Sequence, residues 1–509
     1  GTLGNLASAL SWMASSGSPD ARVQAVRFGQ QCLDQVTAVL GDNHPETLAT
    51  MSNLAVVMEQ AGQHRRSAEV MHKCWKQRER VLGSAHELTL FSMYWYAVAS
   101  NHAGLHKPAA DLLQECYELQ VPLFGECSDV VLCTQHQWML ALSNARDWAK
   151  AVEVGRKCLR SRKQLLRPAL GEAEHPDTLD TMHFLAHALD NSGRHIQAVD
   201  MYTECLHGRT QALGAFHPLT LVTMHGKALA LSNAALYEDA ISLGRQCLEE
   251  RKRILGPRHD HTLSTQHNLA LALAKAGHLT EAVEQARAVW LARCQVLGVD
   301  HVTTLQSQHN LATFLDWDGQ HHEAVTIGEE CLGLRTGKLG EEHPVVLTTL
   351  HYLCQALVHD NQLQRAADLQ HQCWQRWCRV EGDSHPYTLV AAHALGVMLV
   401  KLGDFDRAIP LLQDCMTKRL EQVQRKTKNS TVASVLESRV ALLHALLLAG
   451  DYAGMVTLAD RVRKGDGTSQ LRLGVEDARL VLLAYMLHTA GNTAAFEAET
   501  GVDCAEVVL

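Results

Sequence analysis

A short motif returns along this chain at a fixed spacing, and that spacing limits the possible fold more than any other feature. It reads LGDNHPETL at 40–48 and LGEEHPVVL at 339–347. Neighbouring copies are 42 residues apart, except near 125–170, where one copy is weak and a small insertion follows. The histidine of this frame occurs at His44, His86, His175, His217, His259, His301, His343 and His385. A fixed period of this length indicates a solenoid of stacked repeats.

Each repeat contains two helical patterns. In residues 262–277 apolar side chains recur at helical spacing, and Gly277 ends the pattern. A second helical pattern covers 279–297 and ends at a Leu-Gly pair. An alternating strand pattern of any length is missing. The sequence therefore predicts an all-α fold built from pairs of helices.

The repeat resembles a known family. Leu269-Ala270, Gly277 and Ala282 form the small-residue skeleton of the tetratricopeptide repeat, and other repeats carry the same skeleton. The 42-residue form is similar to the repeats of kinesin light chains and to sensor arrays of STAND-type nucleotide-switch ATPases. The resemblance covers about residues 1–425, or about ten repeats. It implies a right-handed superhelical solenoid of antiparallel helix pairs with a concave peptide-binding groove.

The frame is lost after Arg419. Residues 426–509 contain Leu- and Ala-rich helical patterns without the frame. The ends of solenoids must cover an otherwise exposed core. We therefore expect 426–509 to form divergent C-terminal capping helices.

Composition and motifs argue against several functions. The net charge is −9 with no long basic stripe, which argues against nucleic-acid binding. No apolar run reaches the ~18 residues of a membrane-spanning helix, and no secretory signal is visible. A nucleophile–base set, a pair of carboxylates and a phosphate loop are all missing at meaningful spacing. We expect a cytoplasmic protein that is not an enzyme and uses no cofactor.

The two resembling families each carry a further element. A kinesin light chain has a heptad coiled coil that docks the heavy chain, and a STAND ATPase has a P-loop. Nothing before Leu40 shows a heptad pattern. The string GLRTGKL at 333–339 has the wrong spacing for a P-loop. Kinesin heavy chain is therefore a partner only if the parent protein has a coiled coil.

Nine of the fifteen cysteines share one position in the repeat, and no Cys-x-x-Cys pair occurs. Equivalent positions in successive repeats are too far apart for a disulfide or a shared metal. Reduced cysteine packs as a small apolar residue, so we predict core packing for these cysteines. In three repeats a tryptophan occupies the position just after this one, and these residues are also predicted to lie in the core: Trp75, Trp290, where valine replaces the cysteine, and Trp374.

Two further columns are predicted to be structural. The frame histidines stand where each first helix begins, usually before proline, which suits a helix start. An arginine stands four residues after most of the cysteines, in the last turn of the second helix, where the helix dipole favours a cation.

A second histidine column lies in the middle of the first helices. At about 100° per residue His267 points well away from Leu269, which packs on the partner helix. The resemblance places this face in the concave groove. The column comprises His136, His183, His225, His267, His309, His351 and His393.

Two interpretations of this column stay open. The imidazoles either hydrogen-bond to the neighbouring repeat or contact a ligand, and both hold if each nitrogen takes one role. A metal is the least favoured interpretation, although His183 and His187 have i, i+4 spacing. The residues that we predict to bind peptide in the groove are His136, Asn144, Asp180, His183, His187, Asn191, His225, Asn233, His267, Lys275, Gln306, His309, Thr313, Trp317, His351, Gln355, His359 and His393.

The sequence thus predicts a non-catalytic scaffold that binds peptide segments of partner proteins. The alternative is the ligand-sensing arm of a larger nucleotide-switch ATPase. If the groove histidines keep a pKa near ~6.5, the groove becomes cationic toward pH ~6. Acidic peptides would then bind more tightly below neutrality.

Overall fold

In the computed structural model of the chain, residues 19–166, 174–425, 432–451, 454 and 458 are described. All regular structure in this part of the chain is helical. The predicted all-α fold is therefore confirmed.

The helices fall into two compact units that divide after Pro257. Unit 1 contains α2 (Pro19–Leu40), α3 (Pro45–Gln60), α4 (His64–Leu82), α5 (Glu87–His102), α6 (His106–Phe124), α7 (Asp129–Asn144), α8 (Trp148–Leu165), α9 (Pro176–Asn191), α10 (His195–Leu213), α11 (Pro218–Asn233) and α12 (Tyr237–Leu255). Unit 2 contains α13 (Asp260–Ala276), α14 (Leu279–Leu297), α15 (Val302–Trp317), α16 (His321–Leu339), α17 (Pro344–His359), α18 (Leu363–Glu381), α19 (Pro386–Leu402), α20 (Phe405–Gln424) and α21 (Val432–Ala449).

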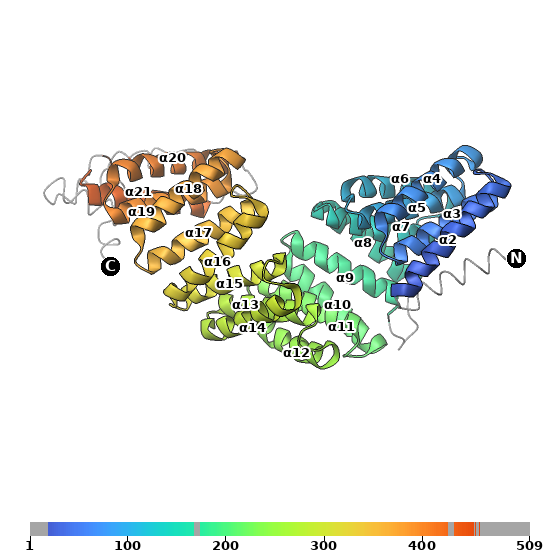
Figure 1. Cartoon of the computed structure of the whole chain (residues 1–509), viewed down its shortest axis with the longest axis horizontal. Helices are drawn as coiled ribbons and strands as arrows, with labels where there is room; N and C mark the ends of the chain where they lie inside the picture. The colour runs from blue at the N-terminus through green and yellow to red at the C-terminus, as the bar shows by residue number, and fades with distance from the viewer. Residues whose placement is uncertain (1–18, 167–173, 426–431, 452–453, 455–457, 459–509) are drawn as a thin grey trace. The chain divides into compact units, whose positions relative to one another are not determined.

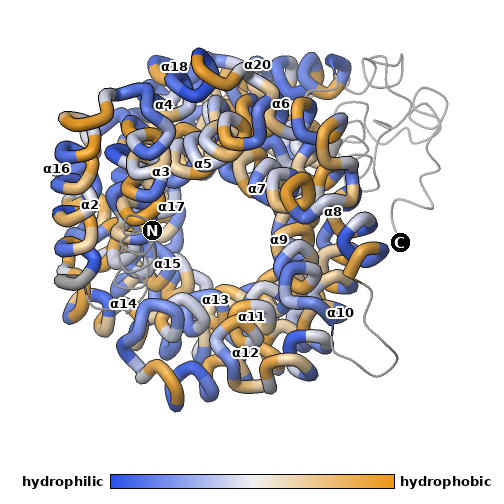
Figure 2. Tube along the Cα trace, turned by 90° about the vertical axis from the view of Figure 1, so that its right-hand side faces the viewer, coloured by the Kyte–Doolittle hydropathy of each residue, from blue (hydrophilic) through white to orange (hydrophobic). Residues whose placement is uncertain are grey.

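Within each unit, a first helix and the second helix that follows it form one repeat. Helices adjacent in sequence pack against each other, and first helices of neighbouring repeats also touch, as α5 does with α3 and α7. Figure 1 shows this stacking in chain order within each unit. In Figure 2 the first helices α3, α5, α7 and α9 of unit 1 lie on the inner side, and α4, α6, α8 and α10 lie outside them.

The frame histidines begin the first helices. His343 Nδ1 accepts a hydrogen bond from the backbone N–H of Val345 at 3.2 Å, so the imidazole takes the place of the usual Ser or Asp cap. The same bond occurs at His44, His86, His175, His217, His259 and His301. His385 stands at the same place without it. The structural role predicted for this column is confirmed.

The cysteine column lies in the core, as predicted, except for Cys32 of α2, which is half-buried. Cys331 is fully buried, and its thiol donates to the carbonyl of Leu305 on the partner first helix at 3.4 Å. Every described cysteine is a free thiol. Trp75 is buried, and Trp374 is half-buried but packs against the core clusters around Leu395 and Leu389. The core prediction was wrong for Trp290, which is half-buried. Trp290 lies beside a surface cavity of about 470 Å³, so a partly open surface faces its ring.

The C-terminal capping prediction is only partly within the described residues. Leu442, Leu443 and Leu446 of α21 are buried in one cluster with Leu412 of α20. The second predicted helix, about 475–499, lies outside the described residues. The capping role of 426–509 stays a prediction.

Candidate functional site

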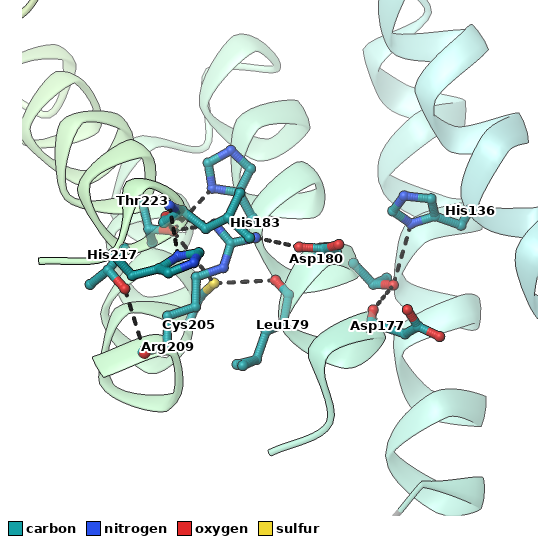
Figure 3. Close-up of polar contacts among 12 residues, drawn as sticks. His136, Asp177, Leu179, Asp180, His183, Cys205, Arg209, His217 and Thr223 are labelled. Atoms are coloured by element: carbon teal, nitrogen blue, oxygen red, sulfur yellow. Dashed lines mark hydrogen bonds and ion pairs between the residues drawn. The ribbon is translucent and has the colours of Figure 1, made fainter. Parts of the chain in front are cut away.

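The middle histidines lie half-buried between neighbouring first helices. His183 Nδ1 of α9 is 3.4 Å from Thr223 Oγ1 of α11, and His136 Nδ1 of α7 is 3.4 Å from Thr181 Oγ1 of α9 (Figure 3). His393 on α19 approaches Ser438 Oγ of α21 in the same way, at 3.5 Å. These contacts are long for hydrogen bonds, so each is weak. Each still joins one repeat to the next.

The other three members of the column in unit 2 use different partners. His267 Nε2 on α13 is 3.3 Å from the side-chain amide of Asn310 on α15. The ring of His309 packs edge-on against Tyr352 of α17, with 5.2 Å between ring centroids. His351 differs, because its Nδ1 lies 3.3 Å from Gln370 Oε1 within its own repeat. Gln355 shares the other imidazole nitrogen of His351 at 3.2 Å.

Burial keeps these histidines neutral. Desolvation, with a contribution from a nearby arginine, lowers the pKa of His136, His267, His309 and His393 to about 4. The pKa of His183 falls to about 3 for the same reasons, with His187 and His225 adding to the shift. The expectation of a cationic groove near pH 6 is therefore wrong for these residues. Its premise of an unperturbed pKa fails because their imidazoles are packed between helices.

The arginine column cross-links repeats. Arg209 of α10 donates to Leu219 O at 2.9 Å and Thr223 Oγ1 at 2.7 Å on α11, and pairs with Asp180 of α9 (Figure 3). The whole column is buried: Arg78, Arg162, Arg209, Arg251, Arg293, Arg335 and Arg419. The predicted role at the helix dipole did not include these bonds to other helices. A guanidinium has several donors, so it can link its own helix to the two neighbouring first helices.

One position near the end of the first helices is more open to solvent. It is occupied by His102, Asn144, Asn191 and Asn233 in unit 1, and by Lys275, Trp317, His359 and Lys401 in unit 2, all exposed. Asn144 Nδ2 donates to Asn101 Oδ1 at 3.1 Å, and Asn233 Nδ2 donates to Asp190 Oδ2 at 2.9 Å. These amides reach back to the preceding repeat. Trp317 presents 49% of its surface to solvent.

A small cavity brings three of the predicted residues together. His309, Thr313 and Trp317 of α15 line it with Tyr352 of α17 and Gly328 of α16. Its volume is about 10 Å³, enough for one water molecule. Tyr352 is 38% exposed and Trp317 is 49% exposed, so both rings of the cavity lining are also accessible from solvent. The cavity itself is too small for a peptide side chain, but the exposed parts of the two aromatic rings offer apolar surface.

Comparison with known proteins agrees with the repeat architecture. Two family models, both described as tetratricopeptide repeat, match residues 177–249 and 219–289, and residues 47–87, 304–345, 346–387 and 388–421. Together they cover more than half of the chain. The chain belongs to the tetratricopeptide repeat family. A tetratricopeptide array is a scaffold for protein–protein interaction, and its function depends on which side chains its surface presents.

Several solved structures are similar to this tetratricopeptide array. The TPR-like repeats of a Podosopora anserina protein assigned as a kinesin light chain are 29% identical over 41% of this chain and 99% of that chain, with a TM-score of 0.38. BtubC (BKLC) from P. vanneervenii is 20% identical over 47% of this chain and 96% of that chain, with a TM-score of 0.39. A Rap protein complexed with Competence and Sporulation Factor is 13% identical over 70% and 99%, with a TM-score of 0.41. No curated protein matches the sequence. None of the described helices is long and apolar enough to cross a membrane.

Other predicted groove residues of the array are engaged within it. Gln306 donates to Asn310 and accepts from Arg335. Asn191 donates to the His187 carbonyl one turn earlier on its own helix. His225 is half-buried on α11, and Lys275 and His187 are exposed. Peptide contact by these residues stays a prediction.

The sequence reading missed Tyr352 and two clusters of carboxylate and imidazole groups. The first cluster joins Glu59, His64 and His102, and the second joins Asp316, His321 and His359. Burial would raise the pKa of Glu59, but hydrogen bonds from His102 and His64 outweigh it and hold that pKa below its usual value. The available signal was a carboxylate followed by histidines 5 and 43 positions later, a spacing shared by both clusters.

Proposed function

We propose that this chain is a non-catalytic adaptor that binds a peptide segment of a partner protein along the first-helix face of unit 2. The observation that carries the proposal is the aromatic rim of the α15–α17 cavity. Trp317 and Tyr352 both line this cavity, and each leaves more than a third of its surface exposed to solvent. An apolar or aromatic side chain of the peptide would pack between the two rings.

Two exposed lysines on the first helices around this rim favour acidic residues in the peptide. Lys275 on α13 and Lys401 on α19 stand at the same helix position as Trp317, and both are exposed. Neighbouring first helices are about 10 Å apart, so the two ammonium groups flank the rim at a distance that an extended peptide spans. Asp318 and Asp360 accept hydrogen bonds from Thr280 and Gln362 but keep their negative charge, so the acidic residues of the peptide would lie at the two lysines, away from these carboxylates. We infer a peptide with one large apolar residue and flanking Asp or Glu.

A peptide-display selection on the full chain tests this function. The wild-type chain should enrich sequences with an apolar residue between acidic residues. The double variant Trp317→Ala, Tyr352→Ala should lose this enrichment, because it removes both rings. Tyr352 also packs against His309 of the histidine column, so the fold of this variant is checked by circular dichroism.

Tyr387→Ala is the matched control. Tyr387 is 59% exposed but stacks on Trp377 of the second helix α18, away from the cavity. It should retain the wild-type enrichment, and all variants should keep the wild-type circular dichroism spectrum. Equal enrichment by the folded double variant would place binding elsewhere on the array. The alternative of a sensor arm in a nucleotide-switch ATPase has no specific observation in its favour.

A further inference from the structure

The end of one first helix, the start of the second helix and the end of the next first helix bring three side chains together. In the Glu59 cluster, Glu59 Oε1 lies 2.7 Å from His64 Nδ1 and 2.5 Å from His102 Nδ1. Glu59 is on α3, His64 opens α4 and His102 closes α5 of the next repeat. One carboxylate oxygen therefore meets two imidazole nitrogens across a repeat boundary.

Unit 2 contains the same arrangement at the same position of its repeats. In the Asp316 cluster, Asp316 Oδ1 lies 2.8 Å from His321 Nδ1 and 2.9 Å from His359 Nδ1. The ligand atoms in each cluster all lie within 4.8 Å of one another. The imidazole rings in the two clusters are also similarly spaced, with centroids 5.3 Å and 5.2 Å apart.

Other repeats show the version without a second imidazole. Asp190 pairs with His195 at 2.7 Å, but Asn233 occupies the third place and donates its amide to Asp190. An amide donor is thus sufficient to tie the repeats together. The two clusters instead hold two imidazole nitrogens and a carboxylate, and each nitrogen can bind a metal once its proton leaves.

The carboxylates are buried more deeply than their partners. The side chain of Glu59 is 9% exposed and that of Asp316 is 7% exposed, whereas His102 and His359 are 45% and 51% exposed. Glu59 Oε2 is buried and has no hydrogen-bond partner. A buried carboxylate oxygen without a partner is costly unless a cation or a donor satisfies it.

We propose that the Glu59 cluster and the Asp316 cluster are each a site for a divalent transition-metal ion of the zinc class. Two imidazole nitrogens and one carboxylate oxygen are a ligand set that Zn²⁺ takes, with a fourth position open to water. Imidazole also suits copper and nickel, whereas magnesium and calcium prefer oxygen ligands.

Binding requires a small adjustment. Tetrahedral ligands at about 2.0 Å from zinc are about 3.3 Å apart, somewhat more than the contacts in either cluster. The exposed imidazoles of His102 and His359 have room to swing outward, while the buried carboxylates stay in place. The metal would displace the Nδ1 protons and link two repeats, so it would stabilise the array by binding the folded state alone.

Calorimetric titration of Zn²⁺ into the chelator-treated full chain tests the proposal. Wild type should bind two ions per chain above the background of surface histidines, and its thermal midpoint should rise. His102→Asn and His359→Asn should each weaken zinc binding at the altered cluster by at least about tenfold. Each variant should then bind one ion fewer than wild type under the conditions of the titration. Asparagine already occupies this position at Asn144 and Asn233, so both variants should fold.

The double variant His102→Asn, His359→Asn should lose both ions and the zinc-dependent rise in thermal midpoint. The converse variant Asn233→His adds the missing imidazole beside Asp190 and His195, and should raise the stoichiometry to three. Unchanged zinc binding in the double variant would overturn the assignment. So would the absence of binding in wild type, which would leave both clusters as hydrogen-bonded links between repeats.

Discussion

Single buried polar residues hold neighbouring repeats together. Arg335 of α16 donates to Thr349 Oγ1 of α17 at 2.5 Å and to Leu305 O of α15 at 3.0 Å, so it contacts two first helices from the second helix between them. A buried charge is tolerated only when its donors are satisfied, and leaving the partners unpaired is expensive. The middle histidines occupy the same boundaries as neutral, weaker links. Both columns therefore contribute to the packing between repeats.

Replacing Arg335 with methionine tests this role. Arg335→Met keeps the apolar stem but removes the guanidinium, so the free energy of unfolding should fall by about 2–4 kcal/mol. Arg379→Met is the control, because Arg379 is 63% exposed in its pair with Glu342 and should change stability by less than about 0.5 kcal/mol. Urea unfolding followed by circular dichroism measures both. Equal midpoints would contradict the cross-linking role.

The lowered pKa of His309 predicts a specific pH dependence. The folded state keeps His309 neutral down to about pH 4, whereas the unfolded chain takes up a proton below pH ~6.5. Stability is therefore unaffected above pH ~6.5 and falls as the pH drops from there toward 4, by about 1.4 kcal/mol per pH unit for this residue.

The comparison of wild type with His309→Gln isolates this effect. The difference in free energy of unfolding should shift in favour of the variant as the pH falls from 6.5 to 4.5, because glutamine does not titrate. Denaturant curves at several pH values measure it. Parallel stability profiles would mean that the imidazole is accessible to protons in the folded state.

Individual helices begin and end where local chemistry dictates. The frame histidine accepts from the second backbone N–H of its helix, and glycine with positive φ follows most second helices, as Gly340 does at 85°. These signals are local, so the sequence predicts the helices and their ends well. The orientation of a middle histidine depends instead on how closely the next repeat packs. For that reason the sequence left open whether the column faces a ligand or a neighbour.

The cap of α17 can be tested by itself. His343→Ala removes the acceptor for the Val345 N–H and should lower the free energy of unfolding by about 1 kcal/mol. His343→Asn should recover most of this loss, since asparagine is a good N-cap. Chemical denaturation of the three proteins measures the effect. If alanine and asparagine behave alike, the imidazole is acting through packing instead of capping.

In the array as a whole, each repeat contacts mainly its neighbours, so function depends on what the exposed surface offers. Many residues that the sequence placed in the groove are used to join repeats, as Asp180 is by Arg209. Trp317 and Lys275 stay exposed, and the sequence identified both from their position in the repeat. It missed Tyr352, because its register lies one residue away from the histidine column. The solvent exposure of a residue such as Tyr352 depends on the side chains of its own repeat and of the neighbouring repeat. The 42-residue period of the sequence does not show how these side chains pack.

The most direct test of the whole account measures peptide affinity and stability on the same variants. A peptide from the display selection is titrated against wild type, Trp317→Ala and His183→Gln. Trp317→Ala should weaken binding by about tenfold or more with little change in the urea midpoint. His183→Gln should lower the urea midpoint and leave the affinity within about twofold. A loss of affinity confined to His183→Gln, with full binding by Trp317→Ala, would contradict the account and return the histidine column to the binding surface.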